Sequence, residues 1–192
     1  MSTLTQQAGA SAQQQLEPYL RPQERLLWSG RPDPSVLFTG KDGFLIPFSL
    51  MWGGFAIVWE VAAIVGTKGS SRWFVLWGIP FVCVGLYMIF GRFILKRRRK
   101  RETAYGLTDR RALVAVGDRS LSDSPVTHIP TSVRRSRDGQ HVTVTFGSQA
   151  GLNRVWANTG MDVLPWWNVN EVAFFDVAEP DQLLAALDRV RG

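Results

Sequence analysis

The chain is poor in the side chains that build catalytic and metal centres. Its 192 residues include one cysteine, Cys83, and two histidines, His128 and His141. A single cysteine excludes an intrachain disulfide, and one cysteine with two histidines makes a zinc site implausible. The sequence also lacks a glycine-rich phosphate loop and a nucleophile elbow. We therefore expect no enzymatic activity and no cofactor.

The chain also lacks a domain with a basic face of its own. The net charge is +6, but residues 1–42 are neutral overall, residues 43–95 carry +2, residues 96–101 carry +6 and residues 102–192 carry −2. A nucleic-acid-binding domain needs a basic surface over the fold that docks. We therefore expect no nucleic-acid partner.

Two long apolar runs, 43–66 and 73–95, dominate the middle of the chain. Each is long enough to cross a hydrocarbon core of about 30 Å as a helix. Together they predict a transmembrane hairpin over residues 43–95. Directly behind it stands a juxtamembrane polybasic block: Lys96, Arg97, Arg98, Arg99, Lys100 and Arg101.

The polybasic block also predicts the orientation of the hairpin. Basic residues near membrane ends stay on the cytoplasmic side and attract anionic lipids. We therefore expect the inner face of a plasma membrane, with the N- and C-termini cytoplasmic and membrane lipids as partners. Arg92 is expected to extend toward its basic neighbours at the cytoplasmic end.

Glu60 is the exception within the first apolar run. It lies near the external end, so it is expected to reach toward water or to pair with Lys68 or Arg72. An ionisable group inside a membrane is also a candidate functional residue. A membrane enzyme or transporter subunit is therefore a remote alternative.

The segment before the hairpin has two parts. Residues 1–15 are rich in Gln, Ala, Ser and Thr, which predicts a disordered tail. Residues 16–42 form a cytoplasmic N-terminal segment with a short apolar stretch around Trp28. We expect this segment, through Trp28, to pack against the C-terminal domain.

Residues 102–192 show the short alternating patterns of an antiparallel β domain. Residues 141–146 alternate apolar and threonine side chains, and an Asp-Gly pair precedes them as a hairpin turn. The serine-rich stretch 119–124 is interpreted as a loop. Residues 179–191 carry leucines and a valine on one face, which predicts a closing amphipathic helix.

The order of these segments resembles the bacterial pleckstrin-homology-like (PH-like) proteins, often described as membrane-flanked domains. The resemblance covers residues 24–191. It rests on Leu-Leu-Trp-Ser-Gly-Arg-Pro before the hairpin, Tyr-Gly-Leu-Thr-Asp-Arg-Arg after it, and a Phe-Phe-Asp-Val strand leading into an acidic-capped helix. It implies a partly open, seven-stranded barrel without enzymatic activity. We therefore expect an α+β membrane protein: a two-helix transmembrane hairpin plus a small antiparallel PH-like β-barrel capped by a C-terminal α-helix.

The motif after the hairpin is interpreted as structural rather than ligand-binding. Thr108 and Asp109 can bond nearby backbone groups and shape a turn, and the two arginines can pair with acids or with phosphate. The family motif comprises Tyr105, Thr108, Asp109, Arg110 and Arg111.

Two further features are binding candidates. Arg134, Arg135 and Arg137 stand beside the Asp-Gly turn, where they would either contact lipid headgroups or form a solvated hairpin edge that resists sheet association. Trp166 and Trp167 are adjacent, so within a strand they would face opposite sides. An exposed tryptophan there would touch the membrane or a protein partner.

These features lead to one preferred function and one alternative. We expect a non-enzymatic, membrane-anchored module on the cytoplasmic face that mediates protein interaction or assembly, with an unknown protein partner or with its own copies. The alternative is a reader of anionic lipid headgroups that uses the three arginines.

Overall fold

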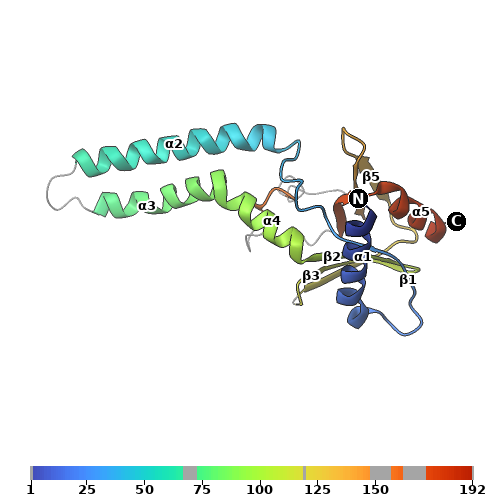
Figure 1. Ribbon diagram of the computed structural model, residues 1–192. Helices are drawn as coiled ribbons and strands as arrows, with labels where there is room; N and C mark the ends of the chain where they lie inside the picture. The colour runs from blue at the N-terminus through green and yellow to red at the C-terminus, as the bar shows by residue number, and fades with distance from the viewer. Residues whose placement is uncertain (1, 67–72, 119, 148–156, 162–171, 192) are drawn as a thin grey trace. The chain divides into compact units, whose positions relative to one another are not determined.

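The computed structural model describes residues 2–66, 73–118, 120–147, 157–161 and 172–191. The fold is α+β, with two long apolar helices and two antiparallel sheets (Figure 1). The chain divides into two compact units. The sheet unit draws on residues 1–36, 97–154 and 168–192, and the hairpin unit draws on residues 37–96 and 155–167.

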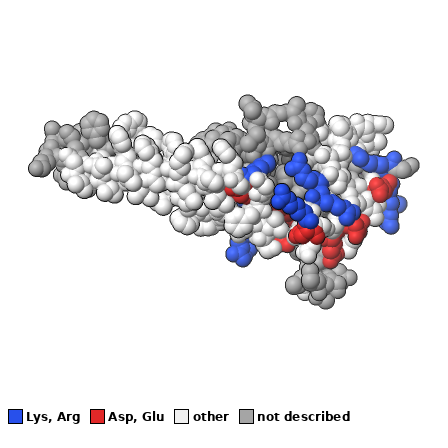
Figure 2. All heavy atoms as spheres, turned by 90° about the horizontal axis from the view of Figure 1, so that it is seen from above, with Lys and Arg blue, Asp and Glu red and all other residues white. Residues whose placement is uncertain are grey.

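The hairpin unit contains the two apolar runs. Helix α2 spans Asp42–Gly66 and helix α3 spans Trp73–Leu86, followed by a π-helical turn, Tyr87–Gly91, and helix α4, Arg92–Glu102, which continues into the sheet unit. Among the described residues, the helices over Asp42–Gly66 and Val75–Glu102 are long and apolar enough to cross a membrane. Figure 2 shows their surface almost free of charged side chains.

Glycines allow α2 and α3 to pack closely. A Cβ atom on Gly85 would lie 2.9 Å from the Cα atom of Gly53, and a Cβ atom on Gly53 would lie 2.8 Å from Ile89 Cδ1. Small residues at such a crossing let two helix backbones approach each other, which is a common basis of helix association in membranes.

The sheet unit contains two antiparallel sheets and helix α5, Pro180–Arg191. The four-stranded sheet has the order β1-β2-β3-β4, and the three-stranded sheet has the order β5-β6-β7. The strands are β1 Leu26–Gly30, β2 Thr103–Thr108, β3 Arg111–Val116, β4 Ser120–Pro125, β5 Thr131–Arg135, β6 His141–Phe146 and β7 Ala173–Ala178.

The expected barrel is not closed. Among the described residues no strand of one sheet pairs with a strand of the other. Strand β1 precedes the hairpin in sequence yet pairs with β2, so residues 102–192 supply only part of the four-stranded sheet. The apolar hairpin is thus inserted between two neighbouring strands.

The main core of the sheet unit is built around Phe174. Its ring centroid lies 4.9 Å from that of Tyr105, 5.0 Å from that of Phe146 and 5.8 Å from that of Trp28. Leucines of α5 bury their side chains in the same cluster. Trp28 thus ties the N-terminal segment to the C-terminal strands through ring packing.

The prediction of a disordered tail over residues 1–15 is wrong. Residues Ser2–Leu16 form helix α1, in which Ala12 and Leu16 are fully buried. They pack against Ala104, Leu113 and Ala115 of the four-stranded sheet, and Figure 1 shows α1 lying across that sheet. The composition of this segment favours disorder because apolar residues are few. Among its described side chains Ala12 and Leu16 enter the cluster, and this tertiary contact stabilises the helix.

The interpretation of residues 119–124 as a loop is also wrong. Residues Ser120–Pro125 form β4, which pairs along the whole length of β3. The serines of this segment are typical of a turn. However, β4 stands at the end of the strand order, and its side chains are exposed or half-buried. Backbone hydrogen bonds to β3, rather than side-chain burial, hold such a strand in place.

Candidate interaction surfaces

The sequence motif over residues 105–111 is built into the four-stranded sheet. The Thr108 hydroxyl accepts hydrogen bonds from the backbone N–H groups of Arg110 and Arg111, at 3.2 and 3.0 Å, and so closes the turn between β2 and β3. Asp109 accepts a hydrogen bond of 3.1 Å from the backbone N–H of Arg25 and donates its own N–H to the Arg25 carbonyl at 3.1 Å. The turn is thereby fastened to the segment that enters β1.

Arg111 lies at the centre of a buried ionic cluster. Its Nε and Nη2 atoms donate to the two carboxylate oxygens of Glu24 at 2.8 and 2.9 Å, and its Nη1 atom donates to Asp123 at 2.8 Å. The Glu24 side chain is fully buried. Hydrogen bonds from Arg111 lower the pKa of Glu24 to about 2, and the Glu24 carboxylate raises the pKa of Arg111.

The remaining motif residues divide between core and surface. Tyr105 stacks on Phe174, and its hydroxyl accepts a hydrogen bond of 3.2 Å from the Phe175 backbone N–H. Arg110 is exposed, with its Nε atom 4.0 Å from the Asp109 carboxylate. Arg111 of the motif is therefore buried in an ionic cluster, whereas the Arg110 side chain is exposed and pairs only with its neighbour Asp109 among the described residues.

The polybasic block does not present one uniform charged surface. Lys96 and Lys100, one turn apart on α4, are 4% and 5% exposed. Lys96 donates to the Leu37 carbonyl at 2.7 Å, while Lys100 donates to the Val36 carbonyl at 2.7 Å and to the Asp176 carboxylate at 2.6 Å. Arg97, Arg98 and Arg101 are exposed and Arg99 is half-buried. The lysines therefore anchor chain segments, and the arginines carry the outward charge.

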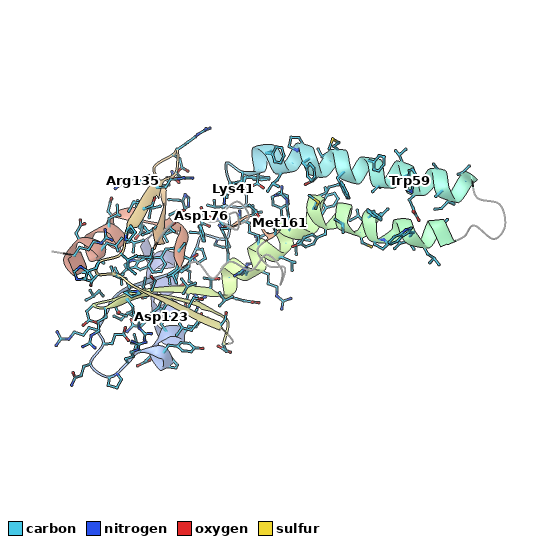
Figure 3. The ribbon with its side chains drawn as sticks, turned by 180° about the vertical axis from the view of Figure 1, so that it is seen from behind. Lys41, Trp59, Asp123, Arg135, Met161 and Asp176 are labelled. Atoms are coloured by element: carbon cyan, nitrogen blue, oxygen red, sulfur yellow. The ribbon has the colours of Figure 1, made fainter. Side chains whose placement is uncertain are left out.

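The three arginines near the Asp-Gly turn share one hairpin but not one face. Arg134 and Arg135 are neighbours on β5, so their side chains leave opposite faces of the strand, and Arg137 lies in the turn that leads to β6. All three are exposed. Arg135, labelled in Figure 3, lies 3.3 Å from the Asp181 carboxylate of α5. Arg134 and Arg135 thus do not converge on one anion.

Two other candidates have different outcomes. Trp166 and Trp167 lie outside the described residues, as do Lys68 and Arg72, the expected partners of Glu60.

The Glu60 carboxylate lies against Gly78 of α3, where an added Cβ atom would collide with Oε2. That oxygen is buried and has no hydrogen-bond partner among the described residues. Glu60 therefore faces the neighbouring helix.

The face of the four-stranded sheet under α1 is a candidate surface that sequence reasoning missed. Leu16 fits over Gly106, where a Cβ atom would lie only 2.7 Å from Leu16 Cδ1. The Gly9 carbonyl accepts a hydrogen bond of 3.0 Å from the Ser29 hydroxyl. We call this face the α1 groove; its apolar lining consists of Ala104, Gly106, Leu113 and Ala115.

Polar contacts along the edge of the α1 groove complete the docking of α1. Arg31 Nε donates to the Ser11 hydroxyl at 3.0 Å, its Nη2 atom donates to Gln15 Oε1 at 2.8 Å, and its Nη1 atom donates to the Arg101 carbonyl at 3.0 Å. Partial burial lowers the pKa of Arg31. The only sequence signal was the i, i+4 spacing of Ala12 and Leu16 in a segment of good helix formers.

No group of three or more His, Cys, Asp or Glu side chains is placed to hold a metal ion in the part of the chain that the structure describes. No family model, curated protein or solved structure matches this chain.

Proposed function

We propose that the chain is a membrane-anchored, non-enzymatic interaction module that binds an α-helix of a protein partner, or of a second copy, in the α1 groove. The observation that carries this proposal is helix α1 itself. It lies on the four-stranded sheet through a small apolar contact and a set of hydrogen bonds to polar side chains. The groove therefore has the shape and chemistry that accept a helix.

Anchoring is supported by the surface of the hairpin unit. Large apolar side chains along α2 and α3 are exposed, among them Phe55, Trp59, Val65 and Trp77. A continuous exposed apolar surface of this kind is unfavourable in water and matches a hydrocarbon environment. The exposed arginines of the polybasic block favour a cytoplasmic location for the sheet unit. A bacterial inner membrane with both termini inside is the arrangement that we propose.

A PH-like fold is the second part of the proposal. Its support is the seven strands described in two antiparallel sheets, together with the C-terminal helix α5 that packs on their shared core. In this reading the hairpin interrupts the fold between β1 and β2. A fragment that begins at residue 102 would lack β1, so experiments require a chain that keeps β1 and the hairpin.

The energetics of α1 are consistent with replacement by a partner. Full burial of one leucine is worth about 1.5–3 kcal/mol, and the entropy of ordering the helix opposes this gain. Among the described side chains of α1, Leu16 is the only large apolar one within the buried cluster. A partner helix with a small residue and a large apolar residue at i and i+4, and with further contacts beyond them, would bind more tightly than α1.

A defined peptide tests the groove directly. The chain beginning at residue 17 is reconstituted in lipid nanodiscs and titrated with a fluorescent peptide of residues 2–16. We expect saturable binding, weakened at least tenfold by Leu16→Asp in the peptide. Gly106→Leu in the protein should weaken binding similarly, because the new side chain fills the space that Leu16 of the peptide would occupy. Equal affinity of both peptides would exclude the α1 groove as a helix site.

Lipid reading remains the alternative function, favoured by the exposure of Arg134, Arg135 and Arg137. Full-length protein is compared by hydrogen exchange in nanodiscs of neutral and of anionic lipid. A lipid reader would show protection of the β5–β6 hairpin only with anionic lipid, and charge reversal at all three arginines would remove it. Identical exchange in both lipids would exclude this surface.

A further inference from the structure

Arg92 is the most deeply buried charged side chain among the described residues of the hairpin unit. Only 1% of the side chain is exposed, and its Nη1 atom lies 2.7 Å from Asp42 Oδ1. The guanidinium also lies over the Phe93 ring, 4.3 Å from the centroid. The other Asp42 oxygen accepts hydrogen bonds from the backbone N–H and hydroxyl of Thr39, at 2.6 and 2.9 Å. Arg92 therefore does not extend toward its basic neighbours, as the sequence suggested, but is fixed inside the unit.

The Arg92 guanidinium lacks hydrogen-bond partners among the residues that the structure describes. Nε, Nη1 and Nη2 of Arg92 are all buried, and none of them makes a hydrogen bond within the described part of the chain, so Nη1 has only its ionic contact with Asp42. Nε and Nη2 form the fork with which an arginine holds two oxygens side by side. In the same chain, this fork of Arg111 holds both oxygens of the Glu24 carboxylate. Buried donors of a charged group are costly to leave unpaired, so the Arg92 fork requires an acceptor.

A pocket of about 200 Å³ adjoins Arg92. Apolar side chains of α2 and of the α3–α4 segment form most of its lining, including Ile46, Leu50, Met88 and Ile89. Leu50 is 56% exposed, so the pocket wall continues into the outward apolar surface of the hairpin. The pocket thus has Arg92 among its lining residues, beside an apolar wall.

We propose that this pocket binds one glycerophospholipid, whose phosphodiester oxygens pair with Arg92 Nε and Nη2 and whose acyl chain lies along the apolar wall. This inference rests on the membrane anchoring proposed above. Arg92 stands four residues before the polybasic block, at the depth where the phosphates of the cytoplasmic leaflet would lie. Arginine suits this ligand because its planar fork matches two phosphate oxygens. Asp42 holds Nη1 and so orients the fork.

The test measures lipid retention by the full-length protein. Purified, delipidated protein is titrated with dioleoyl-phosphatidylglycerol or dioleoyl-phosphatidylcholine in detergent and examined by native mass spectrometry. We expect one retained lipid per chain, with apparent affinity reduced about tenfold by Arg92→Gln. Arg98→Gln is the matched control, since Arg98 is exposed on the same helix and pairs with Glu102. It should leave retention unchanged.

A second variant separates lipid binding from the stability of the Arg92–Asp42 pair. Leu50→Trp enlarges a side chain at the pocket wall without touching the ion pair, and it should reduce retention comparably by filling the pocket. Unchanged retention in both Arg92→Gln and Leu50→Trp would overturn the inference. Retention of both lipids would identify the phosphodiester, rather than the headgroup, as the recognised group.

Failure of the anchoring proposal would look different. Alkaline carbonate extraction of cell membranes reports whether the chain is integrated. A chain released by carbonate would refute the proposed anchoring and the lipid site with it. A chain that stays in the membrane, with variants that retain lipid like the unaltered protein, would refute the lipid site alone.

Discussion

Substitution of Glu24 by Gln should strongly destabilise the sheet unit. Glu24 is fully buried and holds the Arg111 fork through two hydrogen bonds, while its Oε1 atom also lies 2.8 Å from the Thr108 hydroxyl. The neutral amide would leave the buried guanidinium with Asp123 as its one carboxylate partner among the described residues. Removal of one member of a buried ion pair typically costs about 3–5 kcal/mol.

The pKa of Glu24 gives a second estimate of the same magnitude. The folded protein lowers this pKa from 4.5 to about 2. Since one pKa unit corresponds to 1.36 kcal/mol, the ionised carboxylate stabilises the fold by about 3 kcal/mol at neutral pH. A carboxylate with a lowered folded-state pKa contributes fully above pH 4.5. Its contribution is lost as the pH falls from 4.5 toward about 2.

Thermal unfolding of the full-length protein in nanodiscs provides the assay. We expect Glu24→Gln to lower the thermal unfolding midpoint at pH 7 by roughly 10 °C. A protein of this size loses about 2–4 °C in midpoint for each kcal/mol of stability, and the expected loss is about 3 kcal/mol. The difference between the variant and the unaltered protein should shrink below pH 4.5. Glu17→Gln, at an exposed position nearby, is the control and should change little. A shift below 2 °C at pH 7, or a difference independent of pH, would refute this reasoning.

Three further predictions concern packing and buried charge. Lys100→Met should destabilise the fold by about 3 kcal/mol in thermal unfolding, because the Asp176 carboxylate loses its ammonium partner. This carboxylate is only 14% exposed. A loss of stability below about 0.5 kcal/mol would contradict this prediction. Gly85→Val should lower detergent stability by about 1–3 kcal/mol because the new side chain meets Gly53, and an unchanged midpoint would argue against close helix contact. Gly106→Val should accelerate hydrogen exchange of α1 amides at least tenfold, because the added side chain meets Leu16. Unaltered exchange would show that α1 does not depend on the contact between Leu16 and Gly106.

Patterns that depend on length or strict alternation were predictable from the sequence. The two apolar helices follow from run length, since few other structures accommodate more than 20 apolar residues in succession. The strand over His141–Phe146 follows from alternation of apolar residues and threonine, and helix α5 follows from its apolar stripe. These segments can be predicted because the signal for each lies in its own local sequence.

Features that depend on distant partners were not predictable. Helix α1 forms because Leu16 meets Gly106, about 90 positions away in the chain, and no local pattern records that contact. Lys96 and Lys100 cannot be told from their arginine neighbours by the sequence pattern. Both are buried because their ammonium groups donate hydrogen bonds to backbone carbonyls and, for Lys100, to Asp176. Strand β4 has a turn-like composition and is specified by its pairing with β3.

The candidate surfaces show the same division. The sequence correctly placed Arg134, Arg135 and Arg137 beside a turn, but strand geometry separates the first two onto opposite faces. Arg92 was treated as one more basic residue near the membrane boundary. Its burial against Asp42 depends on two helices that meet only in the folded chain.

Site-specific photo-crosslinking in cells tests whether the α1 groove binds a helix of another chain. A photo-reactive phenylalanine analogue replaces Leu121, which packs against the α1 cluster, in the otherwise unaltered full-length chain. We expect intermolecular adducts that increase when Leu16→Asp releases α1 and that disappear with Gly106→Leu. A purified protein that is strictly monomeric, with no intermolecular adduct from any of these variants, would contradict a helix-binding role for the α1 groove.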